Sequence, residues 1–263
     1  PKNYQSTNRD AWNKRVSVHL GSEFYDLEGW KSGKSSLNDI ELELLGDVAG
    51  KSILHLQCHF GQDSLSLARM GAKVVGVDLS DQSIKIAKNL NQELGLDADF
   101  VESDVLELIG KIDQKFDIVF TSYGTIGWLP DLNKWAEVIA HYLKPGGQLV
   151  FADFHPVVWM FDDAFEKIEY RYFQDEAIVE TNTGTYTENE KSLEKTEISW
   201  NHGLAEIFHA LENNWLILKQ FDEYDYSPYN CFSGMKKLDD RKYVIEKHGN
   251  KLPMVYSLLA QKK

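Results

Sequence analysis

The sequence lacks most features of exported, membrane-bound and metal-binding chains. Cys58 and Cys231 are the only cysteines among 263 residues. No second Cys/His pair joins Cys58 and His59 at zinc spacing, and no run of about 18 apolar residues is present. The first residues, PKNYQSTNRDAWNKR, are polar and lack the apolar core of a signal peptide. These absences predict a reduced, cytoplasmic protein without a metal and without a membrane attachment.

Basic residues are also scarce relative to acidic ones. The chain has 28 Lys and Arg against 41 Asp and Glu, which gives a formal net charge of -13. Such a surface repels phosphate backbones, and no Lys/Arg-rich stretch offsets it, so nucleic acid is not expected as a partner. The length suits one α/β domain that buries its core without disulfides. The sequence leaves a monomer and a homodimer open.

From residue 51 onward, short apolar segments alternate with amphipathic helical ones. Four strands are predicted at Ile53–Leu56, Lys73–Val77, Asp99–Glu102 and Phe116–Thr121, and QLVFADF predicts a fifth. Strands that alternate with helices form a parallel sheet covered on both faces. We therefore expect a doubly wound, Rossmann-like α/β fold with about seven mostly parallel strands.

The alternation is flanked by segments of other kinds. Residues 1–48 predict an N-terminal helical cap, and residues 49–155 form the expected core. Residues 156–200 predict an inserted antiparallel segment after the fifth strand, and we expect it to cap the substrate site. Residues 201–263 complete the sheet with a helix and two strands, so the four parts make a single structural domain.

The inserted segment contains two strand-like stretches and one polar run. Lys167–Phe173 and Ala177–Thr181 have strand-like composition. The run TNTGTYTENEKSLEK predicts a polar hairpin or an exposed loop.

Two carboxylates follow buried strands, where a doubly wound sheet binds its ligands. Asp78 follows VVGV, about 20 residues beyond the end of the first strand, where a carboxylate can accept both ribose hydroxyls of a nucleoside cofactor. Asp104 follows the third strand in the same register and can accept from an adenine amino group. Each carboxylate also suits a helix N-terminus, and the local pattern leaves that alternative open.

Five segments occur in a characteristic order: ILHLQCHFG, VVGVDLS, VESDV, FDIVFTSYG and LKPGGQLVFADF. Together they resemble the class I S-adenosylmethionine-dependent methyltransferases over roughly residues 50–154. The resemblance implies a seven-stranded sheet whose last strand is antiparallel. It also implies S-adenosyl-L-methionine as the cofactor, a small-molecule methyl acceptor, and in-line methyl transfer.

The resemblance further implies where the cofactor binds. The first loop would hold its methionyl part, and Leu79 and Val105 would lie on the two faces of the adenine. Asp78 would hold the ribose, and Asp104 the adenine amino group. The expected cofactor-binding residues are Gln57, Cys58, His59, Gly61, Asp78, Leu79, Ser80, Asp104, Val105, Thr121, Ser122 and Tyr123.

The first loop departs from the family pattern. His55 replaces the usual acid, and Gln57 and His59 replace two of three glycines, which would allow positive φ and close backbone approach. Gln57 can accept from an ammonium group and donate to a carboxylate, and His59 can donate to a carboxylate. Whether the two side chains take over backbone contacts or obstruct the cofactor stays open.

Candidate catalytic residues lie in the second half of the chain. His155 follows the fifth strand and suits a general base, or a histidine that bonds to backbone at a strand end. Tyr226, in the aromatic run FDEYDYSPYNCF, suits a substrate-pocket wall that stabilises a sulfonium, or ordinary packing. Trp12 and Arg15 are candidates to cover the cofactor, although such a pair is commonly surface or core.

Two other functions share some of these features. A nicotinamide dehydrogenase has the same fold and an acid after the second strand, but G-x-G-x-x-G spacing is absent here and LKPGG has no role there. A catalytically silent protein that binds S-adenosylmethionine or a nucleoside is supported only by the altered first loop.

Overall fold

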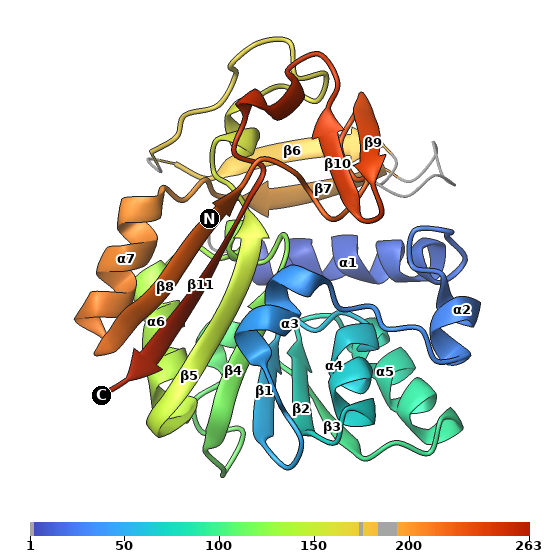
Figure 1. The fold of residues 1–263 in the computed structure, drawn as a ribbon, viewed down its shortest axis with the longest axis vertical. Helices are drawn as coiled ribbons and strands as arrows, with labels where there is room; N and C mark the ends of the chain where they lie inside the picture. The colour runs from blue at the N-terminus through green and yellow to red at the C-terminus, as the bar shows by residue number, and fades with distance from the viewer. Residues whose placement is uncertain (1–2, 174–175, 184–193) are drawn as a thin grey trace.

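The computed structural model of the chain describes residues 3–173, 176–183 and 194–263. Its main sheet has seven strands in the order β3-β2-β1-β4-β5-β11-β8 (Figure 1). Strands β3, β2, β1, β4 and β5 pair in parallel, whereas β11 is antiparallel to both β5 and β8. This arrangement confirms the predicted fold class. The strands are β1 (Ser52–Leu56), β2 (Lys73–Asp78), β3 (Ala98–Glu102), β4 (Phe116–Ser122), β5 (Leu143–Phe154), β8 (Leu216–Tyr224) and β11 (Val255–Lys262).

Helices cover both faces of this sheet. Leu54 and Leu56 of β1 point into a core cluster with residues of α6 and α7. Ile53, which precedes Leu54 in the strand, packs on the opposite face with Leu45 of α3 and Leu67 of α4. A strand buried on both faces is typical of parallel sheets and explains the uninterrupted apolar run in the sequence. The helices are α3 (Asp39–Leu45), α4 (Gln62–Arg69), α5 (Asp81–Glu93), α6 (Leu132–Tyr142) and α7 (Leu204–Asn213).

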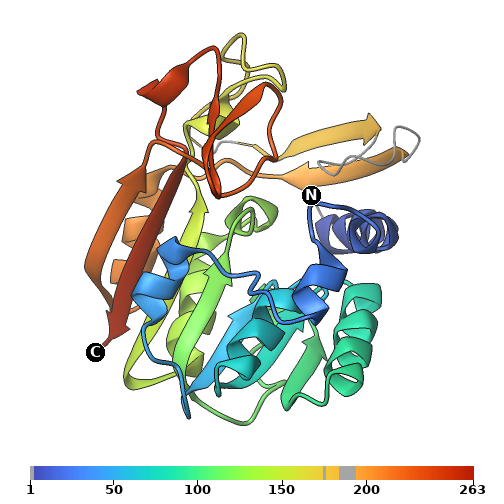
Figure 2. The same cartoon turned by 45° about the vertical axis from the view of Figure 1, so that its right-hand side comes forward.

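The C-terminal ends of the strands are covered by α1 (Tyr4–Leu20) and two antiparallel hairpins. Helix α1 runs across these ends, below the hairpin of β6 (Ile178–Thr183) and β7 (Glu194–Ser199), as Figures 1 and 2 show. The second hairpin, β9 (Met235–Asp239) with β10 (Lys242–Ile245), belongs to the same upper layer. The short helix α2 (Leu27–Lys31) follows α1. Helix α1 and the two hairpins therefore cover the edge of the sheet where the parallel strands end.

The structure corrects one local prediction and adds one hairpin. The stretch Lys167–Phe173 forms no strand, and only an isolated bridge pairs Ile168 with Phe161. Strands β6 and β7 confirm an antiparallel pair in the inserted segment, while residues 184–193 of the polar run lie outside the described residues. The β9–β10 hairpin was not predicted, because most of its side chains are exposed and leave no apolar alternation.

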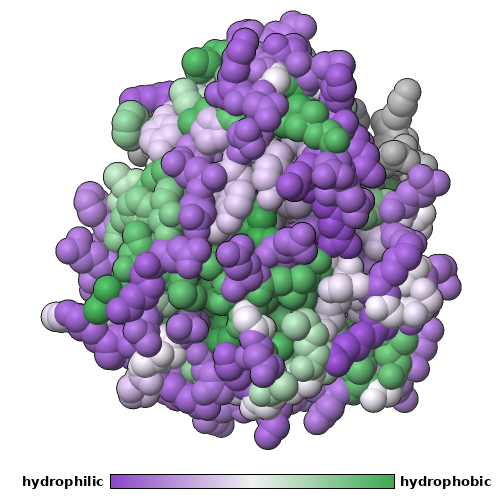
Figure 3. Space-filling view, in the orientation of Figure 1, coloured by the Kyte–Doolittle hydropathy of each residue, from purple (hydrophilic) through white to green (hydrophobic). Residues whose placement is uncertain are grey.

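Hydrophilic residues are spread over the whole face seen in Figure 3, with hydrophobic surface between them over the sheet. Among the residues that the structure describes, no helix combines the length and the apolar character that crossing a membrane requires.

Candidate functional site

A cavity of about 1160 Å³ lies at the C-terminal ends of the parallel strands. It exceeds the roughly 300–1000 Å³ of typical small-ligand pockets, so it has room for a cofactor and a second molecule. Most of the predicted cofactor-binding residues line it: Gln57, Cys58, His59, Gly61, Asp78, Leu79, Asp104, Val105, Ser122 and Tyr123. The structure therefore brings these ten residues together along one cavity.

Ser80 and Thr121, the other two predicted residues, lie behind that wall. Both are fully buried and neither lines the cavity. The Ser80 hydroxyl accepts from the Ser83 backbone N–H at 3.0 Å and donates to Asn13 at 2.6 Å. Ser80 thus caps α5 and fastens it to α1.

The first loop keeps glycine-like backbone geometry without the glycines. Gln57 has φ 55° and His59 has φ 52°, beside Gly61 at φ 85°. Left-handed conformations of non-glycine residues cost about 1–3 kcal/mol and persist where surrounding contacts hold them. Gln57 Nε2 donates to the Thr125 carbonyl at 2.8 Å, and the His59 backbone N–H donates to Asp78 at 2.8 Å. The Gln57 side chain and the Asp78 carboxylate therefore hold the loop in this cavity-facing conformation.

Gln57 and Asp63 present oxygen atoms that suit a cationic ligand. Gln57 Oε1 is shielded from solvent and accepts no hydrogen bond within the described part of the chain. Asp63 lies in the first turn of α4 with Ser122 Oγ 3.5 Å away, and burial raises the pKa of its carboxyl above the usual value. Both residues line the cavity, and each offers an oxygen that can accept from an ammonium group.

His55, at the position of the family's usual acid, provides no charge. Its Nδ1 lies 2.7 Å from Ser64 Oγ, and complete burial lowers the pKa of the ring to about 3. The ring is thus neutral near pH 7. Asp63, eight residues further along the chain, supplies a carboxylate to the same cavity instead.

Asp78 places a carboxylate at the cavity wall. Its Oδ2 accepts from the His59 N–H and its Oδ1 from the Ser80 N–H, each at 2.8 Å. Each carboxylate oxygen has a second lone pair, and the residue is partly exposed to the cavity. Burial raises the pKa of this carboxyl to about 6. The Leu79 backbone N–H also contributes a hydrogen bond, so Asp78 is a carboxylate at the cavity wall that backbone N–H groups hold in place.

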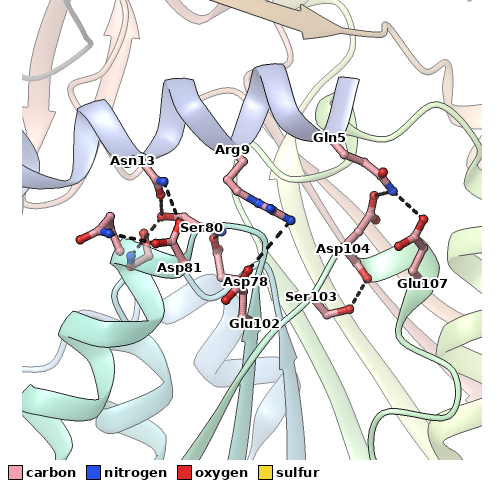
Figure 4. A network of polar contacts seen from close by, with 12 residues as sticks. Gln5, Arg9, Asn13, Asp78, Ser80, Asp81, Glu102, Ser103, Asp104 and Glu107 are labelled. Atoms are coloured by element: carbon pink, nitrogen blue, oxygen red, sulfur yellow. Dashed lines mark hydrogen bonds and ion pairs between the residues drawn. The ribbon is translucent and has the colours of Figure 1, made fainter. Parts of the chain in front are cut away.

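Asp104 is covered by the start of α1, as Figure 4 shows. Its Oδ2 accepts from the Tyr4 hydroxyl at 2.6 Å and from Gln5 Nε2 at 2.7 Å, and its Oδ1 accepts from the Leu106 N–H at 2.8 Å. Only 6% of the residue is exposed. An adenine amino group would have to share this carboxylate with α1 or displace part of it.

Helix α1 also contacts the start of α5 and the end of β3. Asn13 donates to Asp81 at 2.7 Å, and the Arg9 guanidinium lies 4.0 Å from the Glu102 carboxylate (Figure 4). The Trp12 ring lies 5.3 Å from the His59 ring, centroid to centroid. Trp12 and Arg15 both line the cavity, where the sequence suggested a cover for the cofactor.

The two predicted catalytic side chains lie apart from the cavity wall. His155 is 4% exposed; its Nε2 lies 2.8 Å from Glu223 Oε1, and its Nδ1 accepts from the Val157 N–H at 3.2 Å. The Tyr226 ring lies beneath the Lys242 ammonium at 5.0 Å. Since neither residue lines the cavity, we assign neither a role in the reaction.

Glu41 and Tyr123 form a buried pair that the sequence did not reveal. The Tyr123 hydroxyl donates to Glu41 Oε2 at 2.8 Å, and the Asn38 N–H donates to Oε1 at 2.7 Å. Burial raises the pKa of Glu41 to about 7. Tyr123 has φ 46° and lines the cavity, which gives Glu41 indirect access to a ligand.

Asp153 was also missed, and it positions the loop after β4. Its buried carboxylate accepts from the backbone N–H groups of Gly124, Thr125 and Ile126. Thr125 in turn accepts from Gln57, so Asp153 links this loop to the first one. Only the contacts reveal this role, since an acid inside the apolar run FADF has no motif of its own. Within the described segments, no group of three His, Cys, Asp or Glu side chains is placed to hold a metal ion.

Comparison with known proteins shows which solved structures share this fold. The chain aligns with an S-adenosylmethionine-dependent methyltransferase from Clostridium acetobutylicum over 97% of its length and 98% of that chain, at 15% identity and a TM-score of 0.59. It aligns with geranyl diphosphate C-methyltransferase from Streptomyces coelicolor over 99% and 98%, at 14% identity and a TM-score of 0.62. Strand order and these alignments define the fold as that of class I S-adenosylmethionine-dependent methyltransferases.

The sequence comparisons are more specific. Residues 53–147 match the family model of the methyltransferase domain. Over 137 residues the chain is 32% identical to a ubiquinone biosynthesis O-methyltransferase of Klebsiella pneumoniae, covering 51% of this chain and 56% of that protein. The chain thus spans little more than half the length of the curated relatives it matches. Residues 53–147 are thus similar in sequence to a methyltransferase domain, on a fold that the solved methyltransferases share.

Proposed function

We propose that the protein is an S-adenosylmethionine-dependent methyltransferase that acts on a small molecule. The observation that carries this proposal is Asp78, a carboxylate at the end of β2 that lines the cavity and accepts hydrogen bonds from the backbone of His59 and Ser80. When bound, S-adenosylmethionine supplies a sulfonium methyl group that is already activated toward nucleophiles. The protein's task is then to bind, align and exclude water.

The cofactor's adenosine part would lie along the ends of β2 and β3. Asp78 accepts hydrogen bonds from the two ribose hydroxyls, and Leu79 and Val105 hold the adenine between them. Asp104 accepts from the adenine amino group while α1 covers it. Gln57 Oε1 and Asp63 accept from the methionyl ammonium, in place of the acid that His55 replaces.

The methyl acceptor would occupy the remainder of the cavity, under segment 156–200 as substrate cap. Tyr123 stands at this wall, and its hydroxyl bonds to Glu41, whose pKa of about 7 suits proton acceptance near neutral pH. We propose this pair as the proton acceptor wherever the attacking atom must lose a proton. Aromatic side chains around it, including Phe154 and Tyr229, line the same wall and exclude water.

The predicted partners and location rest on composition alone. With a net charge of -13 and no basic stripe, we propose a small-molecule acceptor and no nucleic acid. We propose a cytoplasmic location from the two unpaired cysteines, and either a monomer or a homodimer.

The first prediction concerns Asp78→Ala. We expect S-adenosylhomocysteine to bind the variant at least tenfold more weakly than the wild type, because two hydrogen bonds to a charged acceptor are lost. Isothermal titration calorimetry measures both affinities. Asp99→Ala removes an exposed carboxylate from the neighbouring strand β3 and serves as the matched control, with wild-type affinity expected.

The same titration separates the alternatives. Binding of S-adenosylhomocysteine without binding of NAD supports the methyltransferase, and the reverse supports a dehydrogenase. Unchanged affinity in Asp78→Ala would reject our placement of the ribose. A metabolite screen for S-adenosylhomocysteine release then distinguishes an active enzyme from a silent binding protein.

A further inference from the structure

A buried group of charged residues forms the side of the cavity between α1 and β7. Arg15 of α1 and Lys195 of β7 are each 5% exposed, and both line the cavity. Each contacts one carboxylate, that of Glu197: Arg15 through an ion pair, and Lys195 at 2.8 Å between Nζ and Oε2. Two buried cations therefore share one carboxylate.

A second carboxylate that acts on Lys195, that of Glu180, is engaged elsewhere. Glu180 lies opposite Glu197 in the β6–β7 hairpin, is more exposed than Glu197, and accepts from the Tyr170 hydroxyl at 2.5 Å. Burial and the neighbouring Arg15 charge lower the pKa of Lys195, as expected for an excess of positive charge. The group retains a local demand for negative charge.

Arg15 also has unused hydrogen-bond donors. Its Nε and Nη1 have no partner among the described residues, although both are shielded from solvent. The guanidinium carbon lies 4.7 Å from the Trp12 ring centroid and 5.5 Å from that of Trp128. Buried donors without acceptors destabilise the folded state, so an acceptor at this position stabilises the protein.

We propose that Arg15 and Lys195 form an anion-binding subsite that takes a carboxylate group of a ligand in the cavity. Nε or Nη1 of Arg15 would donate to the carboxylate, because Nη2 already contacts Glu197, and Lys195 supplies a second positive charge. The rings of Trp12 and Trp128 lie against this guanidinium, so an anion bound to it changes their surroundings. Indole fluorescence therefore reports occupancy.

Two ligands can supply this carboxylate. One is the methyl acceptor, which the location of Lys195 and Glu197 favours, since β7 belongs to the hairpin over the cavity and not to the main sheet. The other is the methionyl carboxylate of the cofactor. Assignment to either source rests on the proposed function, whereas the subsite itself does not.

The test compares Arg15→Gln with Lys14→Gln, which removes a charge from an exposed neighbour on the same helix. Each protein is titrated with benzoate and with benzyl alcohol, which has the same ring but no charge, by calorimetry and tryptophan fluorescence. We expect the wild type and Lys14→Gln to bind benzoate with a fluorescence change, and Arg15→Gln to bind it at least tenfold more weakly. Benzyl alcohol should not distinguish the three.

A second arm identifies the source of the carboxylate. S-adenosylhomocysteine carries the amino-acid carboxylate, whereas 5′-methylthioadenosine lacks it. Tenfold weaker S-adenosylhomocysteine binding by Arg15→Gln, with 5′-methylthioadenosine unchanged, assigns the subsite to the cofactor. Unchanged S-adenosylhomocysteine binding, together with lost benzoate binding, assigns it to the acceptor.

The outcomes also separate this inference from the proposed function. If the wild type does not bind S-adenosylhomocysteine, the proposed function fails while the benzoate titration still tests the subsite. The subsite is rejected if Arg15→Gln binds benzoate and S-adenosylhomocysteine as Lys14→Gln does. Lys195→Gln provides a second variant, which leaves the Arg15–Glu197 pair intact and should also weaken benzoate binding.

Discussion

At the scale of single residues, the first loop shows which glycine is indispensable. Gln57 and His59 adopt positive φ, and both side chains have hydrogen-bond partners: Gln57 donates to the Thr125 carbonyl, and His59 Nδ1 lies 3.1 Å from Ser83 Oγ. At Gly61, a Cβ atom would lie 2.9 Å from Ala87 Cβ and 2.9 Å from the Phe100 ring. The chain therefore keeps glycine at the one position of the three where packing also forbids a side chain.

Gly61→Ala tests this explanation against Gly95→Ala. Gly95 also has positive φ, at 61°, but nothing lies within 4 Å of a Cβ built there. We expect Gly95→Ala to lower the free energy of unfolding by about 1 kcal/mol, from backbone strain alone. Gly61→Ala adds overpacking and should cost about 1–3 kcal/mol more. Urea denaturation measures both, and equal losses would contradict the packing argument.

Residues of the cavity wall were predictable where the neighbouring sequence alone indicates their position in the fold. Asp78 and Asp104 follow buried strands, so chain order alone brought them to one edge of the sheet. Asp63 and Glu41 acquire their roles from contacts with Ser122 and Tyr123, which lie 59 and 82 residues away along the chain. Such long-range contacts leave no short motif, which is why these acids were not predicted.

At the scale of elements, burial decided what the sequence could predict. Strands β1, β2 and β4 are buried and form apolar runs that the sequence shows directly. The β9–β10 hairpin is mostly exposed, and its charged residues hide the alternation of a strand. Helix α1 was predicted as part of a helical cap, but its position across the strand ends depends on side-chain contacts with Asp81 and Asp104.

Helix α1 should respond to the cofactor as a unit. It is fastened over the strand ends at Asp104, Glu102 and Asp81 (Figure 4), and a ligand beneath it would add contacts along its length. We expect saturating S-adenosylhomocysteine to slow amide hydrogen exchange across Tyr4–Leu20 several-fold. Mass spectrometry of peptides from α1 measures this.

The exposed hairpin β9–β10 serves as the internal reference for that experiment. Its exchange should change little, because neither strand contributes more than Tyr243 to the cavity wall. Uniform slowing of both elements would indicate general stabilisation, and unchanged exchange in α1 would contradict its role as a cover.

At the scale of the whole molecule, buried carboxyls and buried histidines change the stability of the fold in opposite directions as pH rises. Burial raises the pKa of Glu41 to about 7 and of Asp78 to about 6, so their contributions to stability are present at low pH and lost as pH rises through those values. Burial lowers the pKa of His55 and His59 to about 3. Their contributions are present above about pH 6.5 and lost below it. Stability of the wild type should therefore depend less on pH than either set alone would dictate.

Glu41→Gln isolates the acidic set. At pH 8 the wild type must bury a charged carboxylate, whereas glutamine keeps the acceptor for Asn38 and carries no charge. At pH 5 the wild-type side chain is already protonated in the folded state. Relative to the wild type, the variant should gain roughly 2–3 kcal/mol of unfolding free energy between pH 5 and pH 8. Urea denaturation at both pH values measures this gain, with the exposed Glu43→Gln of the same helix as control. A difference between Glu41→Gln and wild type that is the same at both pH values would show that Glu41 is ionised throughout, and would remove it as a proton acceptor near neutral pH.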